Sequence, residues 1–290
     1  IVAELERRGE LDRTVIVVTS DHGMPFPRVK GQTYVDSVRV PLAIRWPGTV
    51  ARPGQVTDAF VSLIDLAPTL LEAAGVPLAD SGLSPVTGRS LRGLLRGEAF
   101  GRDHILVGRD RNDIGRPQDQ GYPVRGLLTR DFLFLRNYEP GRWPSANPET
   151  GYLDTDGSPT KTVLLERGRH DRADPFWQMT FGFRPVVELY DIVADPDCVH
   201  NLANDPAQAV RLAAMEAKML AALSAEGDPR ALGFGEIFDR YPPARMPWMS
   251  RDPAGFYEAF MAGNRMSTVW INDTDIEPAP LPAPPPANQR

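Results

Sequence analysis

The distribution of apolar residues first identifies a strand that leads into a group of polar side chains. Residues 14–19 (TVIVVT) form a short β-branched run, which is typical of a parallel strand buried on both faces. Polar Ser20, Asp21 and His22 follow at its carboxyl end, and Gly23 permits a sharp turn. Because ligands of open α/β sheets bind beyond the carboxyl ends of the strands, topology places these polar residues at a candidate site.

Helical spacing and turn residues predict the other elements of the first hundred residues. Residues 2–8 have helical spacing, and residues 40–46 (VPLAIRW) form a second predicted strand that ends in a Pro-Gly turn. Residues 62–74 predict a helix. A short helix is expected after Ser90.

From about residue 101 the pattern changes to short strand-like runs that are separated by turn residues, which predicts a mostly antiparallel sheet. These runs are 104–107, 124–128, 132–136, 162–165 and 187–192. Residues 207–225 predict an amphipathic helix, and the proline-rich end should stay extended. We therefore expect a main-domain part at 1–100, a smaller subdomain at 101–276 and a flexible tail at 277–290.

Composition excludes some classes of protein. The 290 residues are 42% hydrophobic, enough for a substantial core in one or two domains. The formal net charge of -6 argues against a nucleic-acid partner, and no apolar run approaches the roughly 18 residues of a membrane span. The single cysteine, Cys198, excludes an intrachain disulfide.

The chain opens without Met or a signal peptide, and its first residues have the pattern of a helix that leads into a strand. A domain rarely begins at such a point, so we expect further sequence upstream.

The chemistry of the polar group suggests a metal and an anion. Asp21 and His22 are adjacent carboxylate and imidazole side chains of the kind that bind a divalent cation, although two ligands do not complete a site. Lys30 lies eight positions after His22, on a loop stiffened by Pro25 and Pro27, where its charge could reach an anion on the metal. Taken alone, an Asp-His-Gly after a strand is more often a capped turn, and a lone loop lysine is usually solvated.

The whole string from residue 15 to residue 48 resembles the late signature of the sulfatase family. The matching elements are Ser20-Asp21-His22-Gly23, Lys30, Tyr34, Arg39-Val40-Pro41 and Trp46-Pro47-Gly48. Further matches follow in family order at residues 60–69 (FVSLIDLAPT), 87–91 (TGRSL) and 188–203, so the resemblance covers roughly residues 14–206.

The resemblance implies an α/β fold of the alkaline phosphatase-like superfamily, with the end of a large sheet domain and a smaller antiparallel subdomain. It implies that Asp21 and His22 are metal ligands, usually for calcium, and that Lys30 contacts the sulfate. Arg109, Arg111 and Arg125 become candidates for sugar or sulfate contacts by position, while each could equally be a surface or structural arginine.

Several segments resemble the sulfamidase branch, which acts on N-sulfoglucosamine. They are the Met-Pro-Phe-Pro loop after Gly23, the segment 121–125 (GYPVR) and Arg142-Trp143-Pro144. The turn Asp110-Arg111-Asn112 departs from the Glu-Arg-His expected there, which leaves the sugar specificity open. The Cys-x-Pro-Ser-Arg motif that supplies the formylglycine nucleophile does not occur in this sequence, so we expect the chain alone to be inactive.

The resemblance thus implies a metal-dependent hydrolase of sulfate esters or sulfamates, with a sulfated small molecule or glycan as substrate. Three alternatives remain at this point. One is a phosphodiesterase or phosphonate monoester hydrolase of the same superfamily, and another is a homologue that binds sulfated glycans without cleaving them. The third is a plain structural domain, against which the ordered string of motifs argues. The family usually acts in the periplasm or a lysosome, and the sequence leaves a homodimer open.

Overall fold

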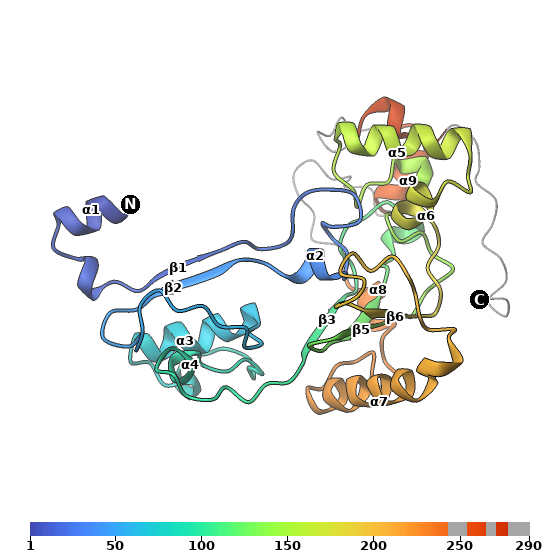
Figure 1. Ribbon diagram of the computed structural model, residues 1–290. Helices are drawn as coiled ribbons and strands as arrows, with labels where there is room; N and C mark the ends of the chain where they lie inside the picture. Colours follow the sequence, from blue (N-terminus) through green and yellow to red (C-terminus); the bar gives the residue numbers. More distant parts are fainter. Residues whose placement is uncertain (243–253, 265–270, 278–290) are drawn as a thin grey trace. The chain divides into compact units, whose positions relative to one another are not determined.

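The computed structural model describes residues 1–242, 254–264 and 271–277, which fold into two compact units (Figure 1). The first unit comprises residues 1–21 and 40–105, and the second comprises residues 22–39 together with the chain from residue 106 onward. The loop 22–39, which carries Lys30, therefore belongs to the unit formed by the later part of the chain. The extended tail predicted at 277–290 lies outside the described residues, apart from Glu277.

The first unit contains a two-stranded sheet. Strand β1 (Ile16–Thr19) pairs antiparallel with strand β2 (Leu42–Arg45), so both predicted strands are confirmed. The prediction that the first strand is parallel and buried on both faces is wrong for this structure. Its side chains are half-buried or exposed, and Val18 is 62% exposed. The β-branched composition favours an extended strand, whereas burial depends on covering layers, which the described residues do not provide over Val18.

The three predicted helices of the first unit are present, together with two short 3-10 turns, η1 (Leu11–Arg13) and η3 (Leu78–Asp80), that were not predicted. The predicted ones are α1 (Val2–Arg7), η2 (Leu63–Asp65) with α3 (Leu66–Ala73), and α4 (Arg92–Leu95). Ser62 and Asp65 form a capping box at the start of the predicted helix 62–74. The buried Asp65 also pairs with Arg102 at 2.5 Å and accepts a hydrogen bond from the backbone N–H of Arg89 at 2.8 Å. This carboxylate therefore ties the helix to the loops that pack beside it.

The second unit is built on a four-stranded sheet in the order β3 (Ile105–Arg109), β4 (Val124–Leu128), β5 (Phe132–Asn137) and β6 (Val187–Asp191). The pairs β4–β5 and β5–β6 are antiparallel, which confirms the predicted character of this region. In this register Val124 lies opposite Asn137, and Phe132 lies opposite Asp191.

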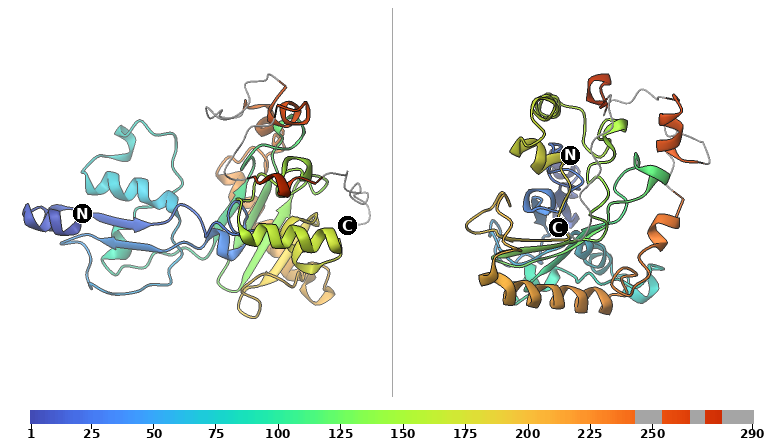
Figure 2. Two further views of the ribbon diagram at one scale, coloured as in Figure 1. Left: turned by 90° about the horizontal axis from the view of Figure 1, so that it is seen from above. Right: turned by 90° about the vertical axis from the view of Figure 1, so that its right-hand side faces the viewer.

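Each face of this sheet is covered by different elements (Figure 2). Helix α7 (Ala209–Ala225), predicted as an amphipathic helix, packs against one face. Leu127, Phe134 and Leu189 point to that face and meet Met215, Met219 and Leu223 of the helix. The opposite face carries Val124, Leu133, Leu135 and Tyr190, which pack against Tyr34 and Val35 at the start of helix α2 (Val35–Val38). Side chains alternate between the faces because successive residues of a strand point in opposite directions.

One predicted strand is a helix. Residues 162–165 lie inside α5 (Pro159–His170), so the prediction of a strand there is wrong. The side chain of Ser158 accepts a hydrogen bond from the N–H of Lys161, and Pro159 occupies the first helical turn. This Ser-Pro start signal outweighs the weak strand preference of the sequence TVLL.

The remaining elements of the second unit are short. They are η4 (Pro117–Asp119), η5 (Pro148–Thr150), α6 (Pro175–Phe181), η6 (Pro206–Gln208), α8 (Ile237–Arg240), α9 (Phe256–Met261) and η7 (Asp273–Asp275). Within the ranges that the structure describes, none of the helices has the length and apolar character needed to cross a bilayer.

Candidate active site

The predicted metal ligands lie immediately after strand β1, at a tightly packed turn. The imidazole Nδ1 of His22 lies 2.6 Å from the carbonyl oxygen of Gly23. Gly23 donates its own N–H to the carbonyl of Ser37 at 3.1 Å, and a Cβ at this glycine would lie 2.0 Å from the carbonyl oxygen of Asp36. A larger residue would therefore push the turn away from helix α2, which explains the glycine after the Asp-His pair.

The orientation of His22 fits a metal ligand. Because a carbonyl oxygen only accepts hydrogen bonds, Nδ1 is the donor in this contact, and Nε2 is the ring nitrogen that would bind a cation. Asp21 adds an exposed carboxylate next to it in the chain. Among the residues that the structure describes, no group of three or more His, Cys, Asp or Glu side chains could hold a metal ion. Asp21 and His22 therefore fit two positions of a mixed carboxylate and imidazole site, and further ligands are required.

Lys30 makes an ion pair that the sequence did not reveal. Its Nζ lies 2.8 Å from Oδ2 of Asp156, which is 126 residues away in the chain. Both side chains are partly buried, with exposed fractions of 33% for Lys30 and 23% for Asp156. The next residue, Gly31, has a φ of +72°, and its carbonyl oxygen accepts a hydrogen bond from Arg109.

Arg109 lies close to the Lys30 loop but makes structural contacts there. Besides Gly31, its guanidinium donates to the carbonyl of Pro144 at 2.7 Å and lies 3.8 Å from Oδ2 of Asp154. Burial lowers the pKa of this guanidinium to about 10, although Asp154 favours its charged form. At neutral pH Arg109 is therefore a buried cation that stabilises the backbone next to Lys30.

A group of carboxylates surrounds these cations. Asp154 is buried and hydrogen-bonded to Arg116, which also donates to the carbonyls of Trp143 at 2.7 Å and Pro144 at 3.1 Å. Burial, together with the negative charge of Asp154, raises the pKa of Asp113 to about 7. The Lys30 loop therefore borders a compact cluster in which acidic and basic groups alternate.

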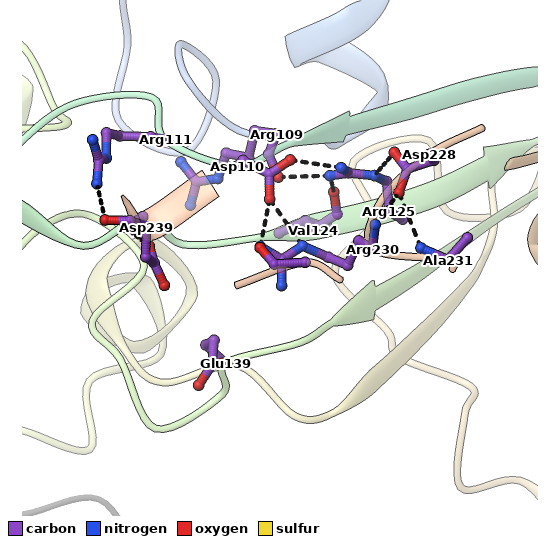
Figure 3. Close-up of polar contacts among 12 residues, drawn as sticks. Arg109, Asp110, Arg111, Val124, Arg125, Glu139, Asp228, Arg230, Ala231 and Asp239 are labelled. Atoms are coloured by element: carbon purple, nitrogen blue, oxygen red, sulfur yellow. Dashed lines mark hydrogen bonds and ion pairs between the residues drawn. The ribbon is translucent and has the colours of Figure 1, made fainter. Parts of the chain in front are cut away.

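Arg125 lies in a separate ion network (Figure 3). Its Nε donates to Asp228 at 2.8 Å and its Nη2 to Asp110 at 2.6 Å, while Nη1 donates to the carbonyls of Arg109 and Val124. Arg230 contacts the same Asp110 carboxylate at 2.7 Å. Along β4, Arg125 points to the same side as Leu127, the α7 face, whereas Tyr34 and Val35 cover the other face. Arg125 is thus held on the face opposite the segment that follows Lys30.

Arg111, the third candidate contact, fixes a loop. It donates to the carbonyl of Tyr241 at 2.6 Å and to the carbonyl of Asp239 at 3.1 Å (Figure 3). Of the three arginines proposed as sugar or sulfate contacts, Arg109 is the one whose side chain reaches the Lys30 loop. A substrate role for any of them stays a prediction.

Sequence reasoning did not identify Asp154 and Asp156. They lie in the segment 151–157 (GYLDTDG), where glycines at both ends and two aspartates indicate a turn. That turn signal was the only indication available, because the partners Lys30, Arg109 and Arg116 are far away in sequence. The pairing becomes visible only in the folded second unit.

Comparisons with known proteins add the following findings. A model of the family described as Sulfatase matches residues 1–76. The N-sulphoglucosamine sulphohydrolase of Homo sapiens is 30% identical over 213 residues, which are 71% of this chain and 40% of that protein. The chain thus spans less than half of the length of this relative.

Solved structures show the same fold. One, described as a complex with its substrate D-glucosamine-2-N,6-O-disulfate, has a TM-score of 0.52 and 22% identity, over 79% of this chain and 38% of that one. The phosphonate monoester hydrolase of Agrobacterium radiobacter also has a TM-score of 0.52, with 21% identity, over 77% of this chain and 37% of that one. At this level of identity, both comparisons show similarity of fold only.

Proposed function

The chain belongs to the sulfatase family, and from that premise we propose that it supplies two metal ligands and an anion-binding lysine to a hydrolase of sulfated sugars. The bond cleaved is a sulfate ester or a sulfamate, as in an N-sulfoglucosamine unit. The names of the similar proteins support this substrate class, because one is a sulphohydrolase of N-sulphoglucosamine and another binds a glucosamine disulfate.

The proposed roles follow from the chemistry of three side chains. Asp21 and His22 hold a divalent cation, for which we propose calcium, and Lys30 donates hydrogen bonds to the sulfate oxygens. When bound, the cation polarises the sulfate group and stabilises the charge that develops on its oxygens. The nucleophile, a formylglycine in our proposal, would come from outside these 290 residues, so this chain alone should not turn over a sulfate ester.

The single observation that carries the proposal is the contact between His22 Nδ1 and the carbonyl of Gly23 at 2.6 Å. It orients the imidazole through Nδ1, so that Nε2 is the nitrogen we assign to the cation, next in the chain to the carboxylate of Asp21.

The test is a sulfate-release assay on the full-length protein, with N-sulfoglucosamine and an aryl sulfate as substrates. We expect turnover that a chelator abolishes and calcium restores. His22→Ala should lower the affinity for the metal on the order of 10-fold to 100-fold or more, as expected when a metal site is disrupted. His104→Ala, at the edge of the other sheet, is the matched control. Turnover that is insensitive to both the chelator and His22→Ala would refute the metal role.

A phosphonate monoester hydrolase is the second candidate, because such an enzyme matches this fold as well as the structure with the bound glucosamine disulfate does. The same protein should therefore be assayed with a phosphonate monoester under identical conditions. A larger kcat/KM for the phosphonate than for any sulfated sugar would favour this alternative. Binding of sulfated glycans without hydrolysis of either substrate would indicate a non-catalytic homologue.

A further inference from the structure

The ion pair between Lys30 and Asp156 joins the anion-binding loop to a distant turn. A lysine ammonium has three N–H donors, and its flexible stem samples many positions unless a partner fixes it. The carboxylate of Asp156 accepts one of these hydrogen bonds at 2.8 Å. Asp156 is the acceptor found for this ammonium among the described residues, so we assign the other two donors to the oxygens of a sulfate group. The partial burial of the pair reduces its screening by solvent relative to a surface ion pair.

The turn that carries Asp156 is held from inside the second unit. The Nζ of Lys161, which is fully buried, donates to the carbonyls of Gly151 at 2.7 Å and Thr155 at 2.8 Å. The N–H of Thr155 in turn donates to the carbonyl of Tyr152 at 2.9 Å. These bonds fix the backbone on the amino-terminal side of Asp156, so its carboxylate is presented from a rigid support rather than from a loose loop.

The same turn also fixes the backbone next to Lys30. Asp154, two residues before Asp156, lies 3.8 Å from the guanidinium of Arg109, and Arg109 donates to the carbonyl of Gly31. Two carboxylates of one turn therefore act on neighbouring residues of the loop. One pairs directly with the Lys30 side chain, and the other acts through Arg109 on the main chain of Gly31.

We propose that Asp156 is a positioning residue, whose carboxylate fixes the Lys30 ammonium where it meets a sulfate group. The inference rests on the proposed function, since it assigns Lys30 to sulfate binding. Asp156 itself does not touch the substrate. Its effect depends on Lys30, because removing the carboxylate lets the lysine stem move and lowers the fraction of time that the ammonium occupies its binding position.

The test is a double-mutant cycle in the full-length protein. Asp156→Asn should lower kcat/KM for the sulfated substrate on the order of tenfold, as expected for a misplaced charge. Asp156→Glu should recover part of this loss because it restores the carboxylate. In the background of Lys30→Met, Asp156→Asn should have no further effect, since there is no ammonium left to position. The matched control is Glu216→Gln on α7. It removes a partly buried ion pair with Arg136 of β5 and should leave kcat/KM unchanged.

Inorganic sulfate supplies a second readout that does not need turnover. The dissociation constant of sulfate, measured by titration calorimetry, should rise in Asp156→Asn and in Lys30→Met. In the double variant it should rise no further than in Lys30→Met alone. If no substrate is hydrolysed but sulfate binding follows this pattern, the proposed function fails and the positioning role stands. Equal losses for Asp156→Asn with and without Lys30, or sulfate binding that none of these variants changes, would overturn the inference.

Discussion

The Nε of Arg125 donates a hydrogen bond to Oδ2 of Asp228 at 2.8 Å, across 103 residues of sequence. Asp110 binds the other edge of the same guanidinium at 2.6 Å, so one buried cation joins strand β4, the end of β3 and the segment after α7 (Figure 3). Hydrogen bonds to both carboxylates keep the pKa of Arg125 above its usual range, despite burial. The arrangement indicates that this arginine stabilises the second unit.

Arg125→Met should therefore destabilise the protein strongly. Removing the shared cation of a buried ion network takes the ion-pair partner from Asp228 and leaves Asp110 with Arg230 alone, which costs about 3–5 kcal/mol. Urea unfolding, monitored for the second unit, measures this loss. Replacing Asp110 and Asp228 by Asn in the same variant should recover part of it. An Arg125→Met protein that unfolds like the parent but has a raised KM would instead favour the predicted substrate contact.

Lys161→Met should also be destabilising. Lys161 is fully buried, and besides the carbonyls of residues 151, 152 and 155 it lies 3.4 Å from the buried carboxylate of Asp275. Burial lowers the pKa of its ammonium to about 8, so the side chain remains largely charged at pH 7. Its removal should cost about 3–5 kcal/mol because Asp275 and the carbonyls lose their donor.

Lys218→Met on the exposed surface of α7 is the control for this change, with an expected effect within about 0.5 kcal/mol. Thermal unfolding at pH 7 compares the two variants. Similar midpoints for both would show that the buried ammonium contributes no net stability.

Asp113 should make stability depend on pH. Its pKa is about 7 in the folded chain and near its ordinary value of 3.8 when unfolded. Between these values the folded state keeps a proton that the unfolded state releases, so the free energy of unfolding falls as pH rises from about 4 to about 7. Above pH 7 both states are ionised and the penalty is constant.

Asp113→Asn removes this penalty and keeps an oxygen for the N–H of Ile114. The variant should be more stable than the parent at pH 8, by at most about 4 kcal/mol, and the difference should shrink as pH falls toward 4. Thermal midpoints at several pH values measure the effect, and Asp80→Asn, at an exposed position, is the control. A difference between Asp113→Asn and the parent that does not change with pH would contradict the raised pKa.

Gly31→Ala should disturb the Lys30 loop in two ways. The φ of +72° is unfavourable for alanine, and the added Cβ would lie 2.3 Å from Nδ2 of Asn112. Gly227 is the matched control for backbone strain alone, because its φ is +76° and an added Cβ would meet nothing within 4 Å. Gly227→Ala should cost about 1–2 kcal/mol.

Gly31→Ala should cost more than this control, and Asn112→Ala in the same chain should recover the difference by removing the clash. Denaturant unfolding of the three variants provides the measurement. Equal losses for Gly31→Ala and Gly227→Ala would mean that the contact with Asn112 has no energetic consequence.

Local sequence signals predicted most elements correctly because their causes are local. The strand at 124–128 was predicted as a short strand-like run between turn residues, and the helix at 62–74 from Ser62 or Asp65 near its start, which form a capping box. The helix α5 was missed because its sequence TVLL resembles a strand, although Ser158 and Pro159 already signal a helix start.

By itself, the sequence determined the family signature, the Asp21-His22 pair and the loop that carries Lys30, because neighbours in the chain define these features. The tertiary structure alone decided that Asp156 pairs with Lys30 and that Arg125 is enclosed by Asp110 and Asp228. The physical reason is that an ion pair depends on distance in space, and residues on separate elements, 15 to 126 positions apart here, approach each other only when the sheet and its covering elements have packed.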